Sequence, residues 1–445
     1  MNITANFSKI TGKIKPMHAV GQPPFIGCND KFFHYLTEAG IPYSRLHDVG
    51  GAFGGNRFVD IPNIFRDFDA DENLPESYDF TFTDWLITAL VRHNVKPFFR
   101  LGVTIENYFR MKAYRIYPPK DFHKWARICE HIIRHYNEGW ADGFEYGIEY
   151  WEIWNEPDGE KDGKGGAMWL GTKEEYFRLY EITANHLKSC FGDSIKVGGY
   201  ASCGFGAGDE DPDCVGFSAP YTEHKYHWVQ YGHDFLKYIS SEEHKAPLDF
   251  FSWHSYAQPE KAIRAVNYCR RLLAKYGFDH VEGILNEWNT APDAVVRGTP
   301  LAAARALSMM LGMQKTRVDM LMYYDARIGA SQYGGMFNPD TWKPYLTYYT
   351  FMMFNDAYKL ENEAESSSDD ANVIVCAAAK DGKSVLLIAN LGDETVADLS
   401  LEGVDLNTAE VLIIDDTYHY SPTGKRIDSG KLILPKHGCV EIRFS

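Results

Sequence analysis

Two glutamates stand directly after apolar segments of the chain. Glu156 follows the run Tyr150–Trp154, and Glu287 follows the run Val281–Leu285. A charge beside buried apolar chain is costly unless it is paired or used. Cleavage of a glycosidic bond needs two carboxyl groups, one protonated to release the leaving oxygen and one anionic to attack the anomeric carbon. The pair therefore predicts acid–base and nucleophilic chemistry on a sugar.

A facing pair of this kind sets its own protonation, because an anionic Glu287 raises the pKa of Glu156. At a separation of about 5–5.5 Å, such a pair forms a covalent intermediate and the product retains its anomeric configuration. Asn155, just before the first glutamate, is placed to hydrogen-bond the sugar 2-hydroxyl. For either glutamate alone, the alternative is a loop carboxylate paired to Arg or Lys. That alternative is weaker for the pair, because both glutamates follow apolar segments that are three strand–helix units apart.

Short apolar segments alternate with amphipathic ones, which predicts strands and helices in turn. The predicted strands are Met17–Gly21, Tyr43–His47, Pro97–Leu101, Tyr150–Trp154, Ile195–Tyr200, Leu248–Trp253, Val281–Leu285 and Met320–Tyr324. The predicted helices are Lys31–Ala39, Phe82–His93, Asp121–Tyr136, Lys173–Phe191, Trp228–Ile239, Lys261–Tyr276, Leu301–Gln314 and Tyr345–Tyr358. Eight such units indicate an α/β fold, a (β/α)8 TIM barrel with catalytic groups at the carboxyl ends of its strands. A doubly wound sheet is the alternative, but no Gly-rich phosphate turn follows the first strand.

The pattern changes after residue 360. The segment Glu361–Ala371 is acidic and small, and it is interpreted as a linker or surface turn. Beyond it, alternating segments flank Asp381–Gly382, a hairpin signal. Strands are expected at Val373–Ala379, Ser384–Asn390, Ala409–Ile414, Lys431–Leu434 and Val440–Phe444. We expect a catalytic barrel over residues 1–360 and a small C-terminal β-sandwich domain over residues 361–445, with residues 1–15 pairing with the sandwich through the strand Ile3–Ser8.

The segments around the two glutamates resemble known signatures. Trp151–Pro157 (WEIWNEP) and Leu285–Asn289 (LNEWN) resemble those of clan A glycoside hydrolases. The chain is most similar to family 39, the group of β-xylosidases and α-L-iduronidases, because Ser44–Asp48 (SRLHD) and Asp249–Tyr256 (DFFSWHSY) resemble that family's second and sixth strands. The resemblance implies no metal and no cofactor. It implies roles for six residues: Glu156 as acid/base, Glu287 as nucleophile, Asn155 as ligand of the 2-hydroxyl, and His47, His254 and Tyr256 as sugar-site residues.

The end of the eighth predicted strand departs from the clan's pattern. Many clan members carry a tryptophan under the sugar there, whereas this chain has Met322–Arg327 (MYYDAR). Trp342 in the following loop is a candidate substitute. Trp288 and Tyr324 are further candidates for substrate binding, and the identity of the sugar stays open at this point.

The segment after His47 is a long insertion, and long loops inside compact domains tend to be functional. We expect residues 50–78 to form one wall of the pocket. Three aromatic side chains in it are candidates to lie near the sugar: Phe53, Phe65 and Phe68.

The composition bears on partners and location. The formal net charge is −16, which argues against nucleic acid and against an anionic membrane surface, because both need a basic face. No stretch reaches the ~18 apolar residues that span a bilayer, and the first residues lack the apolar segment of a signal peptide. The eight scattered cysteines are interpreted as reduced thiols in a cytoplasmic protein.

The residue pattern and the resemblance together predict a retaining exo-acting glycoside hydrolase. A β-xylosidase is the leading hypothesis, with an oligosaccharide or small glycoside as substrate. The same residues acting on another sugar would give a β-galactosidase or a β-glucosidase. A catalytically silent carbohydrate-binding barrel is the alternative from another class, and the presence of both glutamates argues against it. The sequence is also compatible with a homo-oligomer.

Overall fold

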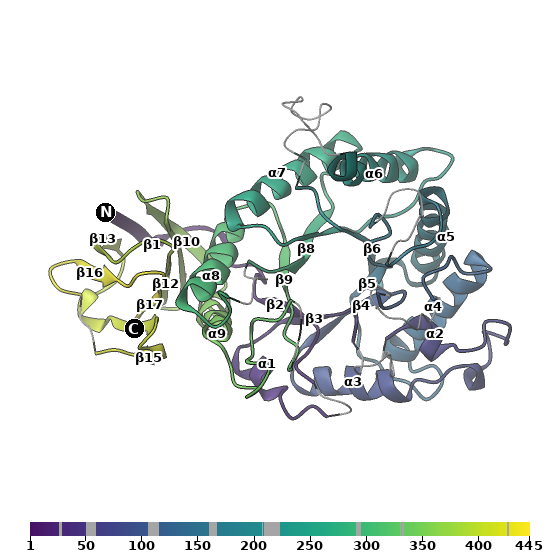
Figure 1. Cartoon of the computed structure of the whole chain (residues 1–445), viewed down its shortest axis with the longest axis horizontal. Helices are drawn as coiled ribbons and strands as arrows, with labels where there is room; N and C mark the ends of the chain where they lie inside the picture. The colour runs from purple at the N-terminus through teal and green to yellow at the C-terminus, as the bar shows by residue number, and fades with distance from the viewer. Residues whose placement is uncertain are drawn as a thin grey trace.

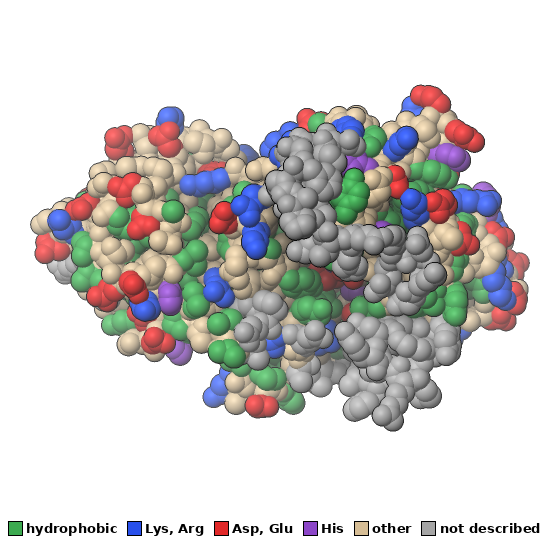
Figure 2. Space-filling model, turned by 45° about the horizontal axis from the view of Figure 1, so that its top comes forward, with side chains coloured by type: hydrophobic (Ala, Val, Ile, Leu, Met, Phe, Trp, Pro, Cys, Tyr) green, Lys and Arg blue, Asp and Glu red, His purple; other side chains and the backbone are tan. Residues whose placement is uncertain are grey.

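The computed structural model consists of a closed barrel and a nine-stranded sheet, joined through two helices (Figure 1). The structure describes residues 1–25, 29–49, 59–105, 115–159, 167–206, 208, 223–290, 295–329, 331, 333–424 and 427–445. None of the helices in this described part of the chain is both long and apolar enough to cross a membrane. On the face seen in Figure 2, acidic side chains alternate with Lys and Arg.

Eight parallel strands close into the barrel in chain order, which confirms the predicted (β/α)8 fold. They are β2 (Ala19–Gly21), β3 (Tyr43–Leu46), β4 (Lys96–Leu101), β5 (Tyr150–Ile153), β6 (Lys196–Ser202), β7 (Phe250–Ser255), β8 (Glu282–Trp288) and β9 (Met320–Tyr324). β2 also pairs with β9, so the barrel has no free edge. All eight strands lie where the apolar segments predicted them.

Helices surround the barrel at the eight predicted places, and the short α2 is an additional helix that was not predicted. They are α1 (His34–Glu38), α2 (Ile61–Ile64), α3 (Thr81–Arg92), α4 (Phe122–Asn137), α5 (Lys173–Phe191), α6 (Glu223–Ser240), α7 (Pro259–Lys275), α8 (Pro300–Gln314) and α9 (Leu346–Lys359). Local sequence fixes where several begin. The Thr172 side chain accepts from the Glu175 N–H while the Glu175 carboxylate accepts from the Thr172 N–H, a capping box that starts α5. The Asp121 carboxylate caps α4 in the same way, by accepting from two N–H groups of the first turn.

The barrel interior is layered. One buried apolar cluster fills it from side to side: Ala19, Tyr43, Phe98, Tyr150, Phe250, Ile284, Met320 and Met322. Side chains two positions apart on a strand point to the same side, so the residues two places further on form the next inward layer. That layer is polar and buried: Arg45, Arg100, Glu152, Ser252 and Asn286. The apolar layer therefore closes the barrel beneath a polar layer at the carboxyl ends of the strands.

The remaining strands form one sheet in the order β15-β14-β17-β12-β11-β10-β1-β13-β16. They are β1 (Asn2–Lys13), β10 (Asn362–Ser368), β11 (Val373–Lys380), β12 (Lys383–Asn390), β13 (Thr395–Glu402), β14 (Glu410–Ile414), β15 (His419–Pro422), β16 (Lys431–Leu434) and β17 (Cys439–Phe444). The interpretation of Glu361–Ala371 as a linker or surface turn is wrong, because β10 occupies most of it. Its polar residues pair along β1, where the half-exposed surface suits Ser and Glu. The boundary near residue 361 stays a prediction.

The sheet folds over on itself. Phe7 of β1 and Phe444 of β17 lie four places apart in the strand order, which is about 19 Å in a flat sheet at ~4.8 Å per strand. Their ring centroids are 5.5 Å apart. The two halves therefore face each other as a sandwich around a second apolar core.

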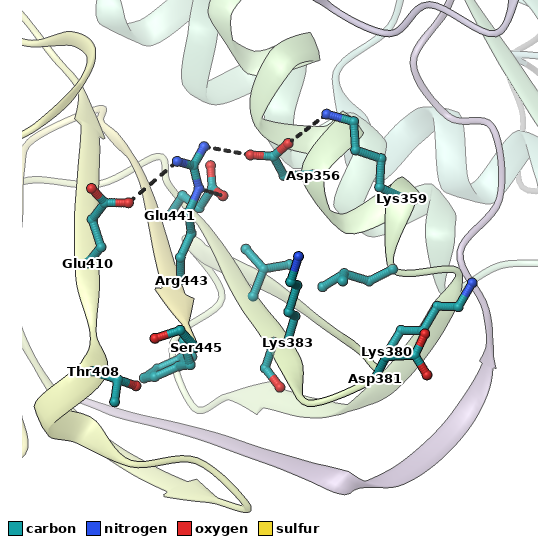
Figure 3. A pocket seen from close by; sticks show the side chains of 14 residues that line it. Asp356, Lys359, Lys380, Asp381, Lys383, Thr408, Glu410, Glu441, Arg443 and Ser445 are labelled. Carbon is teal, nitrogen blue, oxygen red and sulfur yellow. Dashed lines mark hydrogen bonds and ion pairs between the residues drawn. The ribbon is translucent and has the colours of Figure 1, made fainter.

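The sandwich also packs against the barrel, because strand alternation gives β11 and β12 two apolar faces. Val375 and Ala377 lie in the sandwich core, whereas Cys376 and Ala378 pack in the main core with α8 and α9. At the rim of this junction, charged side chains line a cavity of about 580 Å³ between α9 and the sheet (Figure 3).

Candidate active site

Arg45 is the centre of the polar layer. It lies on β3 with almost no exposed surface, and its guanidinium makes three directed contacts. Nε donates to Glu152 Oε2 at 2.7 Å, one terminal nitrogen donates to Glu287 Oε1 at 2.8 Å and the other to Asn155 Oδ1 at 2.5 Å. A planar guanidinium with five donors suits such a junction, so Arg45 fixes residues from β5 and β8 relative to each other.

Glu152 on β5 anchors the layer from below. Besides Arg45, its carboxylate accepts from Ser252 Oγ at 2.6 Å and Asn286 Nδ2 at 2.5 Å. A buried charge is tolerated when it is paired and its remaining lone pairs are filled. Glu152 therefore has a structural place under the site, with donors from three other strands.

Glu156 and Glu287 face each other above this layer. Donor atoms of the two carboxyl groups and of His254 all lie within 4.8 Å of one another. His254 Nδ1 is 2.7 Å from Glu156 Oε1 and 3.5 Å from Glu287 Oε2. The structure thus brings together the two glutamates that the sequence singled out, on the carboxyl side of β5 and on β8.

Irregular backbone aims both glutamates inward. Trp154 (φ 71°) and Glu156 (φ 44°) take the left-handed conformation, which is uncommon for residues of this size. The Trp154 indole donates to the Met168 carbonyl at 2.8 Å and so holds this turn. On β8 the pairing register shifts beside Asn286 and Glu287, and this bulge lets two consecutive side chains enter the barrel. Strained and bulged backbone is typical of functional sites.

The two carboxyl groups have different surroundings. Burial raises the pKa of Glu156 to about 7, and the nearby Arg45 only partly opposes that effect. Burial also raises the pKa of Glu287, but His254 and Arg45 act against it, and Tyr256 donates to Glu287 Oε2 at 2.8 Å. Burial lowers the pKa of His254 to about 4, so this ring is neutral near pH 7. The arrangement favours a proton on Glu156 and a charge on Glu287.

His47 and Tyr324 lie beside the carboxylates. His47 is buried with Nε2 3.2 Å from Asp48 Oδ1, and burial beside Arg100 and Arg45 holds its pKa well below the ordinary value. The Tyr324 hydroxyl donates to Asp48 Oδ2 at 3.3 Å and accepts from Gln22 Nε2 at 2.5 Å. His47 Nδ1 and His254 Nε2 have no hydrogen-bond partner among the described residues. Both nitrogens are buried, so each is a polar atom that these residues leave unsatisfied beside the carboxyl groups.

Trp288 is not where the sequence suggested, and the contact of Trp342 with substrate stays a prediction. Trp288 is fully buried and packs on Tyr323 and on Phe351 of α9, so its ring points out of the barrel, away from the carboxylates. This outward direction follows from strand alternation, since Glu287 before it points inward. Trp342 is 41% exposed and its ring meets Phe32, which puts it on the rim.

The structure shows the surroundings of two rings of the predicted aromatic wall. Lys124 of α4 lies over the rings of Phe65 and Phe68, 5.9 Å and 5.6 Å from their centroids. Phe65 further meets Tyr78 edge-on. These two rings therefore lie beside Lys124 of α4, while Phe53 lies outside the described residues. The role of this segment as a pocket wall stays a prediction.

Four residues beneath the glutamates were not predicted from the sequence: Arg45, Glu152, Ser252 and Asn286. Site residues were expected at strand ends, whereas these side chains lie within strands. A signal was present, because a charged residue in an apolar strand is costly unless paired. Arg45 precedes His47 by two positions, and Glu152 stands in the middle of Tyr150–Ile153.

Two groups of described residues have donor atoms close enough to hold one metal ion. The first is Glu156, His254 and Glu287, at the site above. The second is Glu130, His186 and Cys190, on α4 and α5 outside the barrel.

Comparisons with known proteins indicate the family to which the chain is similar. The sequence profile of "Glycosyl hydrolases family 39" matches residues 37–309. A β-xylosidase from Geobacillus stearothermophilus is 27% identical over 318 residues, covering 64% of this chain and 54% of that protein. A β-xylosidase from Caldicellulosiruptor saccharolyticus is 30% identical over 223 residues, covering 45% of this chain and 40% of that protein. The matches thus span about half of these relatives or less.

Solved structures share the whole fold at low sequence identity. A glucosidase from Croceicoccus marinus superposes with a TM-score of 0.75 at 18% identity, covering 100% of this chain and 98% of that one. A monomeric β-xylosidase from Caulobacter crescentus CB15 gives a TM-score of 0.69 at 16% identity, covering 100% and 99%. At this identity, the likeness concerns the fold.

Proposed function

Because the chain belongs to glycosyl hydrolases family 39, we propose that it cleaves glycosides with retention of configuration, with Glu287 as nucleophile and Glu156 as acid/base. One observation carries the proposal: the two carboxyl groups approach within 4.8 Å at the mouth of a barrel that is closed below. Retaining enzymes place these groups about 5–5.5 Å apart, whereas inverting enzymes leave about 6.5–9.5 Å for a water molecule.

In the first step, Glu287 attacks the anomeric carbon and the bond to the leaving oxygen breaks. Glu156 gives its proton to that oxygen, so the leaving group departs as a neutral alcohol. Arg45 and Tyr256 hold the Glu287 carboxylate at one oxygen each, and so stabilise it as an anion before attack. The product of the step is a sugar joined to Glu287 by an ester bond.

In the second step, Glu156 is the anion and takes a proton from water. The water oxygen attacks the anomeric carbon, the ester bond breaks and Glu287 leaves as a carboxylate. Two inversions give net retention. Asn155 accepts from Arg45 through Oδ1, which leaves its Nδ2 to donate to the 2-hydroxyl. The unpartnered His47 Nδ1 and His254 Nε2 are further sugar contacts in this proposal.

For the substrate we propose a β-xyloside cleaved from a chain end. The two relatives described above are named β-xylosidases, which favours a pentose over a hexose. A β-glucoside is the second candidate, since a structure that covers the whole chain is named a glucosidase.

The test is a panel of 4-nitrophenyl β-xyloside, β-glucoside and β-galactoside, with proton NMR of the first-formed sugar. We expect the xyloside to give the highest kcat/KM and a product of β configuration. A first product of α configuration would refute the nucleophile assignment. A higher kcat/KM for the glucoside would refute the substrate and leave the mechanism in place.

A further inference from the structure

The second group of metal-ligating side chains lies away from the barrel mouth. Helices α4 and α5 pack side by side on the outside of the barrel, on either side of β5 in the chain (Figure 1). Glu130 is on α4. His186 and Cys190 are one turn apart on α5, and residues four positions apart share a helix face. We propose that Glu130, His186 and Cys190 bind one thiophilic divalent cation, for which zinc is the reference, across these two helices.

The donor atoms are already close to the distances that a cation requires. His186 Nε2 is 2.6 Å from Glu130 Oε2 and 3.9 Å from Cys190 Sγ. Tetrahedral zinc with ordinary bond lengths separates nitrogen from oxygen by about 3.4 Å and nitrogen from sulfur by about 3.6 Å. Entry of the ion needs the carboxylate to withdraw by about 0.8 Å, while the sulfur moves by a few tenths of an ångström. Rotation of two surface side chains can supply both changes.

The surroundings orient the carboxylate. Arg134, one turn further along α4, donates to Glu130 Oε1 at 2.8 Å, so Oε2 is the oxygen turned to His186. A partner that fixes a ligand in this way is the usual outer shell of a metal site. The Glu130 and His186 side chains are 14% and 29% exposed. Water can therefore reach the group and supply a fourth ligand.

An ion pair between His186 and Glu130 accounts for two of these residues but not for the cysteine. Cys190 is a free, half-buried thiol, and one oxygen, one nitrogen and one sulfur donor make a set that suits zinc. Calcium and magnesium prefer oxygen alone. A bound cation would tie α4 to α5, the helices on either side of the strand that leads to Asn155 and Glu156.

The test is cobalt(II) titration of the full chain carrying Glu287→Gln, which weakens the other donor group as a competitor. We expect one equivalent to bind with a thiolate-to-cobalt charge-transfer band and strong visible bands of a four-coordinate ion. Added Cys190→Ser should abolish the charge-transfer band, and added His186→Ala should weaken binding by about tenfold or more. His244→Gln is the control, because His244 forms a similar pair with Glu181, at 3.2 Å, and should change nothing.

Thermal unfolding with and without zinc gives a second readout, since a ligand that binds the folded state raises Tm. The rise should be present in Glu287→Gln and His244→Gln and absent after Cys190→Ser, with equal Tm values in chelator. A charge-transfer band that survives Cys190→Ser, the lack of any such band in the parent, or equal zinc-induced shifts in parent and Cys190→Ser would each overturn the proposal.

Discussion

Two charge networks in this molecule are built alike and placed differently. In each, one arginine serves three carboxyl groups. Arg45 in the barrel binds Glu152 and Glu287 and lies near Glu156. Arg443 at the junction between the barrel and the sandwich binds the other set: Glu441, Asp356 and Glu410 (Figure 3). The junction differs in that Lys359 also pairs with Asp356, at 3.3 Å, and Asp356 and Glu410 are partly exposed. In each network, burial makes one carboxyl group hold its proton more firmly than an ordinary carboxyl group does.

Burial raises the pKa of the first such group, Glu156, to about 7, and of the second, Glu441, to about 8. The Glu156 side chain is 22% exposed beside a second carboxylate within reach of the same ligand. Glu441 is 0% exposed, and the Tyr420 hydroxyl and Arg443 occupy its two oxygens. A raised carboxyl pKa therefore marks a proton donor only where the group meets an opening and a reacting partner. At the junction, the same electrostatics acts on stability alone.

The largest expected effect comes from Glu287→Ala. It removes the proposed nucleophile, so kcat/KM should fall on the order of 10⁴–10⁶-fold for every substrate. Azide can attack from the vacated side, and the glycosyl azide formed should have inverted configuration. Proton NMR of that product is the measurement. Glu441→Ala is the matched control at the junction. A comparable loss of turnover in this variant would contradict the proposed difference between the two networks.

Glu156→Ala should have a smaller effect that depends on the leaving group. It removes the proposed proton donor but keeps the proposed nucleophile, so kcat/KM for an unactivated disaccharide should fall about 10²–10⁴-fold. A dinitrophenyl glycoside needs little protonation and should still form the intermediate. Azide should then give a product of retained configuration, and equal losses for both substrates would contradict the assignment.

The two arginines provide the next comparison. Arg45→Met leaves Glu152 buried without its cation, which should lower the free energy of unfolding by about 3–5 kcal/mol. It should also lower turnover by about 10²-fold, because Glu287 loses a partner that favours its charge. Arg443 is half-exposed, so Arg443→Met should cost about 1–3 kcal/mol and leave kcat/KM unchanged. Urea unfolding and turnover of the nitrophenyl xyloside measure both, and equal loss of activity in the two variants would contradict the contrast.

The fold and the two glutamates could be predicted because each depends on local pattern. Apolar runs of strand length followed by amphipathic segments gave all eight barrel strands. Glu156 and Glu287 followed from their places at the ends of such runs. The prediction for Glu361–Ala371 failed because it depends on distant sequence. β10 forms a strand because it pairs with β1, which is far away in the chain. No local apolar alternation marks a half-exposed strand of Ser and Glu.

The direction of individual side chains was the second feature that could not be predicted from the sequence. Trp288 was a candidate for substrate binding because it follows Glu287, yet alternation after an inward Glu287 turns Trp288 outward onto α9. The bulge that also turns Asn286 inward depends on register with neighbouring strands, and no single segment encodes it. Arg45 could have been found by counting two residues back from His47, since alternate residues share a face.

A smaller effect is expected from pH. Glu156 must hold its proton to assist departure of a poor leaving group, so kcat/KM should fall above about pH 7, by up to about tenfold per pH unit. The acid limb belongs to Glu287, whose raised pKa places that limb above the ordinary carboxyl range. Steady-state rates on a disaccharide measure the profile. In Glu156→Ala with a dinitrophenyl glycoside, the alkaline limb should vanish, and its persistence would assign that limb to another group.

Glu441→Gln should leave turnover unchanged and should affect stability instead. In the folded protein the pKa of Glu441 is raised to about 8, so between its ordinary value and that value the folded state keeps a proton that the unfolded state has lost. The free energy of unfolding therefore falls as pH rises through this window, by up to about 1.4 kcal/mol per pH unit. Glutamine cannot titrate. Its Oε1 can accept from Arg443 Nε while its Nε2 donates to the Tyr420 hydroxyl oxygen, so the variant should gain Tm relative to the wild type from about pH 6 to about pH 8. Scanning calorimetry of both proteins across that range measures the difference.

Glu410→Gln is the control. It removes a carboxylate that is 49% exposed from the same arginine, and it should follow the wild type. Parallel Tm curves for Glu441→Gln and the wild type would mean that Arg443 keeps Glu441 ionised. The two networks would then share their residue types but not a carboxyl group with a raised pKa.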